Sequence, residues 1–328
     1  MTAEPVAQSA EPAGPGYDVQ ELGYDVLDGL TRPQKELSSR FLYDDRGADI
    51  FEEILELPEY YQGRAEMAIL RSHGATIMAR YEPTEIIDLG AGSGEKAGQL
   101  IAVAGGRAIT YSPVDLSGDM LRLCESHFST GWDHVAVRPI LGDVTQLSSI
   151  APETQSDTRR LIVMFGGTVG NLLLGTRRRF LTEIASHLGP QGHVLLGLDL
   201  LKAPSTIEAA YADAAGVTAE FNRNILMTLN RRLGANFPLE AFDHVIVFDE
   251  GKGWIEMRLR ARRRCVIDFT ALDWSVEIAP GEEIRTEVSA KFNRDGFQRE
   301  AAWCGLELVD WFTDEQGQFA LALLSAQS

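Results

Sequence analysis

Three glycines at alternate positions follow a short apolar run and precede a segment with helical character. They are Gly90, Gly92 and Gly94, within the sequence IIDLGAGSGEK that ends at Lys96. Glycine reaches positive φ and removes side chains from a turn, so a ligand can lie against bare backbone N–H groups at the start of a helix. The spacing indicates a nucleotide-binding turn, and an ordinary strand-to-helix turn is the alternative.

Two familiar nucleotide motifs match this turn poorly. The dinucleotide fingerprint needs its third glycine where Glu95 or Ala97 stands, and Glu95 also interrupts the Gly-Lys-Ser/Thr order of a P-loop. The stretch resembles acidic-x-Gly-x-Gly-x-Gly, the first motif of class I S-adenosylmethionine methyltransferases. This resemblance implies S-adenosylmethionine as the cofactor, bound by the three glycines and Lys96.

Two acidic residues follow the next predicted strands. Asp115 ends the apolar segment 108–114, and Asp143 follows the segment 137–141. In doubly wound folds an acid after the second strand binds the ribose hydroxyls, which is the role predicted for Asp115. The methyltransferase resemblance implies that Asp143 meets the adenine amino group. A capping Asp in a loop is the alternative for both residues.

The elements around these residues alternate between strand and helix. Further strands are predicted over 161–165 and 193–198, and helices over 64–81, 95–103, 117–128 and 177–188. The helix 292–304 and strands 307–312 and 319–324 are typical of the end of a class I methyltransferase. Because ligands bind beyond the carboxyl ends of parallel strands, Asn171 is expected in the same crevice as Gly92.

The alternation stops near Lys202. Helices are predicted over 206–214 and 217–233, and β runs over 241–249 and 254–268 that the turn 250–253 joins as a hairpin. The predicted fold is α/β, a Rossmann-like class I methyltransferase sheet with an inserted α+β substrate-recognition domain. The predicted division is a disordered tail, 1–16, a cofactor-binding domain, 65–201 and 290–328, and a substrate-binding domain, 17–64 and 202–289.

Composition narrows the class of protein. The chain has 328 residues, 45% hydrophobic content and a net charge of -18, which argues against nucleic acid or an anionic membrane as partner. The basic segment 258–264 is expected to be the solvated face of a strand. The cysteines, Cys124, Cys265 and Cys304, are far apart and suggest neither disulfides nor a zinc site, so a reducing cytoplasm is expected. No apolar stretch is long enough for a membrane span.

A sharper resemblance comes from motifs in both predicted domains. The chain resembles the L-histidine Nα-methyltransferase family of ergothioneine biosynthesis from about residue 24 to the C-terminus. The resemblance implies three successive methyl transfers from S-adenosylmethionine to the α-amine of L-histidine, giving hercynine, without a metal and in a monomer. The motifs lie at 41–44, 57–61, 88–90, 167–172, 211–218, 221–224, 255–257 and 286–289.

The same resemblance implies the substrate-binding residues. Glu287 and Ser289 would bind the imidazole, with Met257 on the wall beside it. The α-amine and carboxylate would be held by Tyr43, Tyr60, Asn171 and Tyr211. From the sequence alone, packing aromatics are the alternative for Tyr43 and Tyr60.

The assignment is coherent in physical terms. Asn171 can donate to a carboxylate and accept from an amine. Glu287 and Ser289 are two apart on an extended segment, so both point to one side, and phenylalanine would leave Glu287 buried and unpaired. The amine must be neutral before each transfer. Tyr43 and Asn171 are predicted as the catalytic residues, and the Tyr43 hydroxyl is expected to take or relay the proton, with solvent as the alternative.

Two other functions fit the sequence. One is an N-methyltransferase of the same fold that acts on another amino acid, and side-chain selectivity would reveal it. The other is a non-catalytic protein that senses S-adenosylmethionine, which would bind the cofactor without turnover.

Overall fold

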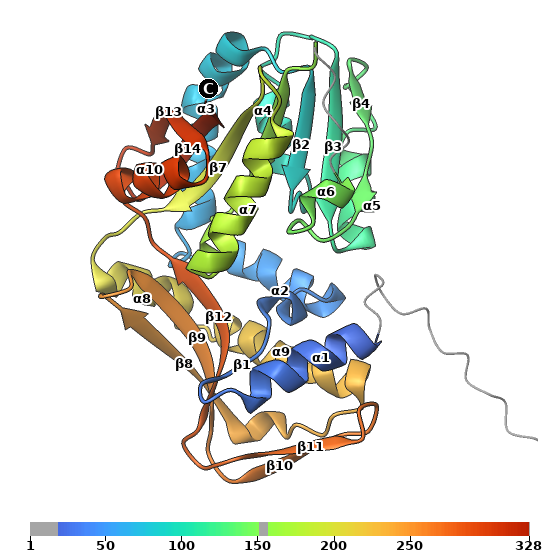
Figure 1. Cartoon of the computed structure of the whole chain (residues 1–328), viewed down its shortest axis with the longest axis vertical. Helices are drawn as coiled ribbons and strands as arrows, with labels where there is room; N and C mark the ends of the chain where they lie inside the picture. The colour runs from blue at the N-terminus through green and yellow to red at the C-terminus, as the bar shows by residue number, and fades with distance from the viewer. Residues whose placement is uncertain (1–18, 151–156, 328) are drawn as a thin grey trace, which may run out of the picture.

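The protein is built on two main sheets that lie at opposite ends of its long axis (Figure 1). The structure, a computed structural model, describes residues 19–150 and 157–327. The predicted tail, 1–16, lies outside the described residues. The two main sheets share no strand, and a separate two-stranded hairpin completes the β structure of the described chain.

The larger sheet has eight strands and carries the glycine turn. Its order is β13-β14-β7-β6-β2-β3-β4, with β5 also paired to β3. The strands from β7 to β4 are parallel, and β14 is antiparallel to both β7 and β13, which confirms the predicted α/β sheet. The bounds are β2 Glu85–Leu89, β3 Ile109–Asp115, β4 Val135–Val137, β5 Ile140–Leu141, β6 Arg160–Met164, β7 His193–Asp199, β13 Leu306–Thr313 and β14 Phe319–Ala326.

The third predicted strand is two short strands. Instead of one strand over 137–141, β4 ends at Val137 and β5 begins at Ile140. Pro139 lies between them and has no N–H to donate to β3, so the ladder is interrupted there. The register with β3 resumes at Val114, which keeps Asp143 just beyond the carboxyl edge of the sheet.

Helices cover both faces of this sheet. One face packs in a core with α3, α4 and α5, and the other with α6, α7 and α10. Strand β6 is buried along its whole length, as its continuous apolar run predicts. The bounds are α3 Gln62–Tyr81, α4 Glu95–Ile101, α5 Gly118–His127, α6 Leu147–Ile150, α7 Leu174–His187 and α10 Arg294–Trp303.

The smaller sheet has the order β1-β12-β9-β8. Its strands are β1 Lys35–Glu36, β8 Phe242–Asp249, β9 Trp254–Ala261 and β12 Glu283–Ala290, and β8 pairs antiparallel with β9 as the predicted hairpin. The predicted run 254–268 is not one strand, because the chain leaves this sheet after Ala261. Residues Cys265–Phe269 form β10, which pairs with β11, Trp274–Ile278, in the separate hairpin.

The N-terminal and inserted segments share one hydrophobic core. Side chains from Leu22 to Tyr61 and from Ile207 to Ile284 form a single buried cluster. We propose on this ground that 17–64 and 202–289 form one domain. Its helices are α1 Val19–Thr31, α2 Asp45–Leu55, α8 Pro204–Tyr211 and α9 Val217–Leu233, with 3-10 turns η1 Ser39–Leu42 and η3 Leu239–Ala241.

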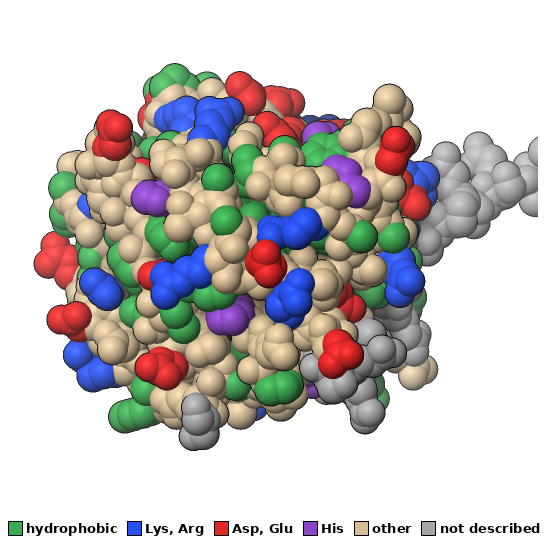
Figure 2. Space-filling view, turned by 90° about the horizontal axis from the view of Figure 1, so that it is seen from above, with side chains coloured by type: hydrophobic (Ala, Val, Ile, Leu, Met, Phe, Trp, Pro, Cys, Tyr) green, Lys and Arg blue, Asp and Glu red, His purple; other side chains and the backbone are tan. Residues whose placement is uncertain are grey.

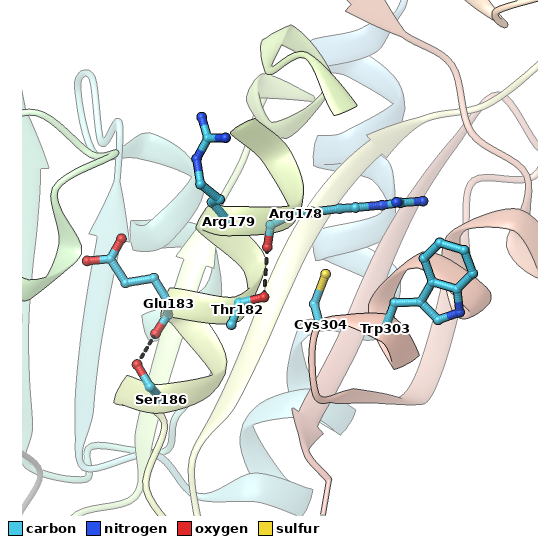
Figure 3. Close-up of a pocket in the computed structure, with 7 residues that line it drawn as sticks. All are labelled: Arg178, Arg179, Thr182, Glu183, Ser186, Trp303 and Cys304. Carbon is cyan, nitrogen blue, oxygen red and sulfur yellow. Dashed lines mark hydrogen bonds between the residues drawn. The ribbon is translucent and has the colours of Figure 1, made fainter. Parts of the chain in front are cut away.

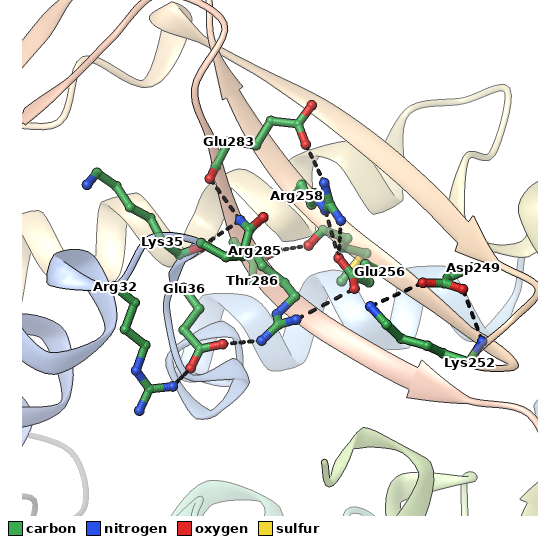
Figure 4. Close-up of polar contacts among 12 residues, drawn as sticks. Arg32, Lys35, Glu36, Asp249, Lys252, Glu256, Arg258, Glu283, Arg285 and Thr286 are labelled. Carbon is green, nitrogen blue, oxygen red and sulfur yellow. Dashed lines mark hydrogen bonds and ion pairs between the residues drawn. The ribbon is translucent and has the colours of Figure 1, made fainter. Parts of the chain in front are cut away.

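Most of the basic segment 258–264 is solvated, as predicted, since Arg260 and the arginines at 262–264 are exposed, but residues 262–264 lie beyond the end of β9. Arg258 is mostly buried and pairs with Glu256 and with Glu283, whose Oε2 lies 2.7 Å from Arg258 Nη1 (Figure 4). The other four arginines, 260 and 262–264, also have an acidic partner each. Basic and acidic side chains are interspersed on the face in Figure 2 as well. Among the described residues, no helix is long and apolar enough to span a bilayer.

Candidate active site

The glycine turn joins β2 to α4 at the carboxyl edge of the larger sheet. Gly90, Gly92 and Gly94 all have positive φ, and Gly94 caps the N-terminus of α4. Asp115, at the end of the neighbouring β3, accepts hydrogen bonds from the N–H of Gly92 at 3.0 Å and of Ser117 at 2.9 Å. The structure therefore brings the predicted ribose-binding acid and the turn together.

Gly94 is required by both its backbone and its surroundings. Its φ is +78°, and a Cβ there would lie 2.5 Å from the sulfur of Cys124 and 3.2 Å from Phe128. Any side chain would push the turn away from α5, Gly118–His127. The close approach of turn and helix thus depends on this glycine.

Lys96 extends the turn with a positive charge. Its ammonium lies 2.7 Å from Oε2 of Glu66, a fully buried carboxylate on α3 that also accepts from the N–H of Gly166 at 2.8 Å. The partly exposed ammonium can still donate to a further anionic group. Nothing in the sequence pointed to Glu66, because an acid on a covering helix has no distinctive spacing.

Asp143 has a local role in the described structure. Its Oδ1 accepts from the backbone N–H of Thr145 at 2.8 Å and from the Thr145 hydroxyl at 2.7 Å. These hydrogen bonds are the ones expected of a capping Asp in a loop, which was the alternative to an adenine-binding role. Contact with adenine remains a prediction for the rest of this carboxylate.

On the smaller sheet, a β-bulge determines which way Glu287 faces. Arg285 pairs with Arg258, but the next pair along β12 is Glu287 with Met257, so Thr286 is the extra residue. In a regular ladder Thr286 would oppose Met257, and Glu287 would fall on the other face, beside the ion pairs of Figure 4. The bulge instead puts Glu287 and Ser289 on the face that carries Met257.

Thr286 itself anchors the bulge. Its hydroxyl is hydrogen-bonded to the side-chain oxygen of Asn222 at 2.5 Å and lies 3.1 Å from the carbonyl of Met257. Asn222 lies on α9 and also donates to the carbonyl of Arg258 at 3.1 Å. The bulge is thus tied to the helix that covers this face.

Asn171 reaches Glu287 from the other sheet. It is the last residue of η2, Thr168–Asn171, just beyond β6, and its Nδ2 donates to Glu287 Oε1 at 2.8 Å. Gly170 permits this approach, because a Cβ there would lie 2.9 Å from the carbonyl oxygen of Ala290. Burial raises the pKa of Glu287 to about 7, with Lys291 acting in the opposite direction.

The three predicted tyrosines lie around this carboxylate. Tyr43 follows η1, Tyr60 lies between α2 and α3, and Tyr211 ends α8. Burial and the nearby Glu287 and Tyr211 hold the pKa of Tyr43 well above its usual value, and burial, Tyr211 and Tyr43 do the same for Tyr60. At neutral pH both phenols keep their protons, so Tyr43 can relay a proton but is disfavoured as a base.

A buried charge cluster lies where the chain passes between the sheets. Asp199, at the end of β7, pairs with Lys291 Nζ at 2.8 Å and also with Lys202. Tyr61 and Gln62, at the start of α3, donate to the same carboxylate at 2.9 and 2.8 Å. The three passages, after Tyr61, after Asp199 and after β12, therefore meet at one carboxylate.

Neither Asp199 nor Lys291 was predicted from the sequence, for identifiable reasons. Asp199 directly follows the predicted strand 193–198, so the strand-end rule that selected Asp115 could have found it. Lys291 had no such signal, because a buried lysine is rare and its side chain gives no spacing pattern.

The candidate site lies away from the surface depression between α7 and α10. That depression has a volume of 590 Å³ and includes Arg178, whose guanidinium lies 4.4 Å from the ring centroid of Trp303 (Figure 3). None of the predicted site residues lines it. Its lining residues are Arg178, Arg179, Thr182, Glu183, Ser186, Trp303 and Cys304.

The residues at the turn suit S-adenosylmethionine. The carboxylate of Asp115 can accept from ribose hydroxyls, the Lys96 ammonium can pair with the cofactor's carboxylate, and the glycines leave the backbone bare. Among residues 19–150 and 157–327, no group of three or more His, Cys, Asp and Glu side chains is arranged to hold a metal ion.

Comparison with known proteins identifies the family. The family model described as histidine-specific, SAM-dependent methyltransferase matches residues 22–326. A histidine N-alpha-methyltransferase from Mycolicibacterium smegmatis is 38% identical over 93% of this chain and 94% of its own length. Ergothioneine biosynthesis protein 1 from Neurospora crassa is 31% identical over 90% of this chain and 34% of its own length.

A solved structure of an S-adenosylmethionine-dependent methyltransferase from Clostridium acetobutylicum is 12% identical, with a TM-score of 0.49 over 85% of this chain and 99% of that chain. The match to the family model and the similarity to the Mycolicibacterium smegmatis protein extend over both sheets. The chain belongs to the histidine-specific, SAM-dependent methyltransferase family.

Proposed function

We propose that this enzyme transfers methyl groups from S-adenosylmethionine to the α-amine of L-histidine, three in succession, giving hercynine for ergothioneine biosynthesis. The Mycolicibacterium smegmatis relative bears the name of the first activity, and the Neurospora crassa relative that of the pathway. The observation that carries the substrate assignment is the buried Glu287 carboxylate, which Asn171 holds at the junction of the two sheets.

This carboxylate suits a ring that offers an N–H. Asn171 occupies Oε1 of Glu287, so Oε2 can accept from an imidazole nitrogen while Ser289, two residues along the same face, meets the other nitrogen. Phenylalanine would leave the carboxylate buried without a partner, which is costly. Met257, opposite Glu287, supports the same assignment as the apolar wall of the pocket.

The other end of histidine needs both donors and acceptors. Asn171 Oδ1 can accept from the α-amine, and the hydroxyls of Tyr60 and Tyr211 can donate to the carboxylate. The closeness of these groups supports this role, since Glu287 and Tyr211 both add to the effect of burial in raising the pKa values of Tyr43 and Tyr60. Together with Tyr43, these side chains, which come from four separate segments, would hold one amino acid in place for attack.

The chemistry is a nucleophilic displacement. S-adenosylmethionine, when bound, supplies a sulfonium-activated methyl group, so the protein's main task is to orient a neutral amine. We propose that the Tyr43 hydroxyl relays the amine proton toward solvent: its oxygen accepts the proton as its own O–H proton leaves, so the phenol, which burial keeps protonated by raising its pKa, stays neutral. Tyrosine rings also tolerate the quaternary ammonium product, which can no longer donate hydrogen bonds.

The proposed function is tested by mass spectrometry. Purified protein is incubated with S-adenosylmethionine and each proteinogenic amino acid, and gains of one, two and three methyl groups are scored. A trimethylated product from histidine alone is the expected result. Methylation of a different amino acid would discard the imidazole assignment, and cofactor binding without any product would favour a sensor.

We propose a monomeric, cytoplasmic enzyme with a small-molecule substrate and no metal requirement. The three buried, free cysteines support a reducing compartment. The net charge of -18 and the acid-paired arginines of 258–264 support the absence of a nucleic-acid or membrane partner. Because a sulfonium is already activated, the chemistry needs no Lewis acid. Light scattering and activity in the presence of a chelator test these points.

A further inference from the structure

Lys291 has three hydrogen-bond partners and lies beside the proposed imidazole pocket. It follows β12 directly, its side chain is fully buried, and its ammonium lies 2.8 Å from Oδ2 of Asp199. The same ammonium donates to the hydroxyl of Ser289 at 2.9 Å and to that of Tyr211 at 3.0 Å. An ammonium has three N–H groups and no acceptor, so each contact uses one of its protons.

These contacts restrict what the two hydroxyls can do. The Tyr211 hydroxyl receives a second hydrogen bond from Gln62 Nε2 at 3.3 Å, so both of its acceptor positions are filled and its own proton is left to donate. The Ser289 oxygen has an ammonium 2.9 Å away, which makes it a stronger donor and a poor acceptor for another N–H.

The ammonium is held in its charged form. Asp199 and the Tyr211 hydroxyl raise the pKa of Lys291 above its usual value despite burial, and Lys291 and Lys202 lower the pKa of Asp199 against the same desolvation. The pair is therefore ionic at neutral pH. Lys291 cannot exchange its donor role for an acceptor role.

We propose that Lys291 is a positioning residue that makes Ser289 and Tyr211 hydrogen-bond donors toward the bound amino acid. The inference rests on the proposed function, and it specifies the class of side chain selected. With Glu287 as the acceptor, the pocket requires a ring that offers an N–H on one side and a lone pair on the other. Neutral imidazole meets both requirements, indole and pyrrole meet one, and phenyl meets neither.

The test compares two lysines that share one carboxylate. Lys291→Met removes the ammonium that contacts both hydroxyls, while Asp199 keeps Lys202, Tyr61 and Gln62 as partners. Lys202→Met is the matched control, because Lys202 contacts Asp199 and the Tyr61 hydroxyl at 2.6 Å. Thermal melting and cofactor affinity report whether each variant is folded.

The readout is the ratio of kcat/KM for histidine to that for its pyrrole analogues, in which CH replaces one ring nitrogen. The better of the two analogues keeps the N–H for Glu287 and loses the lone pair facing Ser289. We expect wild type to prefer histidine by about tenfold, the factor of one hydrogen bond. Lys291→Met should reduce this ratio to about twofold, whereas Lys202→Met should retain it.

A second variant keeps the inference testable if Lys291→Met does not fold. Ser289→Ala, which leaves the ion pair of Lys291 and Asp199 in place, should bring the ratio close to one. If Lys291→Met does fold, adding it to Ser289→Ala should change the ratio no further, since Lys291 acts on the ring through Ser289. A wild-type ratio in Ser289→Ala, or equal losses in the two lysine variants, would overturn the inference alone. A wild-type protein that does not methylate histidine would overturn the proposed function as well.

Discussion

The cofactor edge of the larger sheet and the substrate face of the smaller sheet position their side chains differently. At the cofactor edge, a strand end and the next turn suffice: Asp115 binds the N–H of Gly92, and both belong to neighbouring strand–turn units. On the substrate face, Glu287 depends on a bulge, on Asn171 from the other sheet and on a buried lysine. The cofactor site is thus local in sequence, and the substrate site is assembled from distant segments.

The largest expected effect is a loss of activity toward histidine that leaves cofactor binding unchanged. Glu287→Ala should lower kcat/KM for histidine by about a hundredfold, because the imidazole N–H loses a charged acceptor. Discrimination against phenylalanine should weaken, while the cofactor Kd stays unchanged. Steady-state kinetics and calorimetry measure these quantities, and Glu287→Gln, which retains an acceptor, should lose less. An equal loss of cofactor affinity would show that the regions are not separable.

A glycine substitution tests the cofactor edge. Gly94→Ala should lower the free energy of unfolding by about 1–3 kcal/mol or more, since it adds strain at positive φ and a contact at 2.5 Å with Cys124. Cofactor affinity should fall with it. Gly105→Ala is the control, because Gly105 also has positive φ but no atom within 4 Å of the added Cβ. Denaturant titration of both variants would contradict this account if their losses were equal.

The pH dependence should reside on the substrate side. Glu287 must be ionised to accept from imidazole, and burial raises its pKa to about 7, so kcat/KM for histidine should rise as the pH passes through about 7. Glu287→Gln should lose this dependence and retain the rise that comes from deprotonation of the substrate amine. A wild-type profile in Glu287→Gln would contradict the assignment.

The smallest effect concerns stability at the cofactor edge. Burial raises the pKa of Asp88 to about 7 in the folded protein, above its usual 3.8, although Tyr111 donates to it. A carboxyl whose pKa is raised by folding takes up protons when the chain folds. The stability that the protonated Asp88 contributes is therefore fully present at low pH and is lost as the pH rises toward 7. Asp88→Asn should therefore gain Tm relative to wild type as the pH rises from about 4 to about 7. A constant difference in Tm would mean that Asp88 ionises normally.

The cofactor half was largely predictable because its functional residues lie at or just after the ends of strands. The buried run that became β6, the glycine turn and Asp115 can each be recognised from adjacent residues. Helix α9, Val217–Leu233, was also predicted with the bounds observed. Strand-end residues remain recognisable even where strands are short, as at β5.

In the substrate half, α9 and the β8–β9 hairpin were predicted from the sequence pattern, but the pocket residues came only through the family resemblance, and their supports were missed. Alternation along β12 cannot reveal a bulge, because Ile284 and Glu287 share a face although they are three apart. The predicted strand 254–268 likewise failed, since the arginines of 262–264 continue a β-like pattern while the chain changes partner strands. Pairing partners, the bulge and the buried Lys291 are properties of tertiary structure.

The meeting of three chain passages at Asp199 has a consequence for cooperativity of unfolding. Separating the two sheets would expose the Asp199 carboxylate or leave it buried without its partners, which are Lys291, Lys202, Tyr61 and Gln62. Breaking such a buried pair is strongly unfavourable, so neither half can unfold while the other keeps its native contacts at this point. The two halves should therefore melt in a single calorimetric transition, and Asp199→Asn should be the substitution that divides it into two.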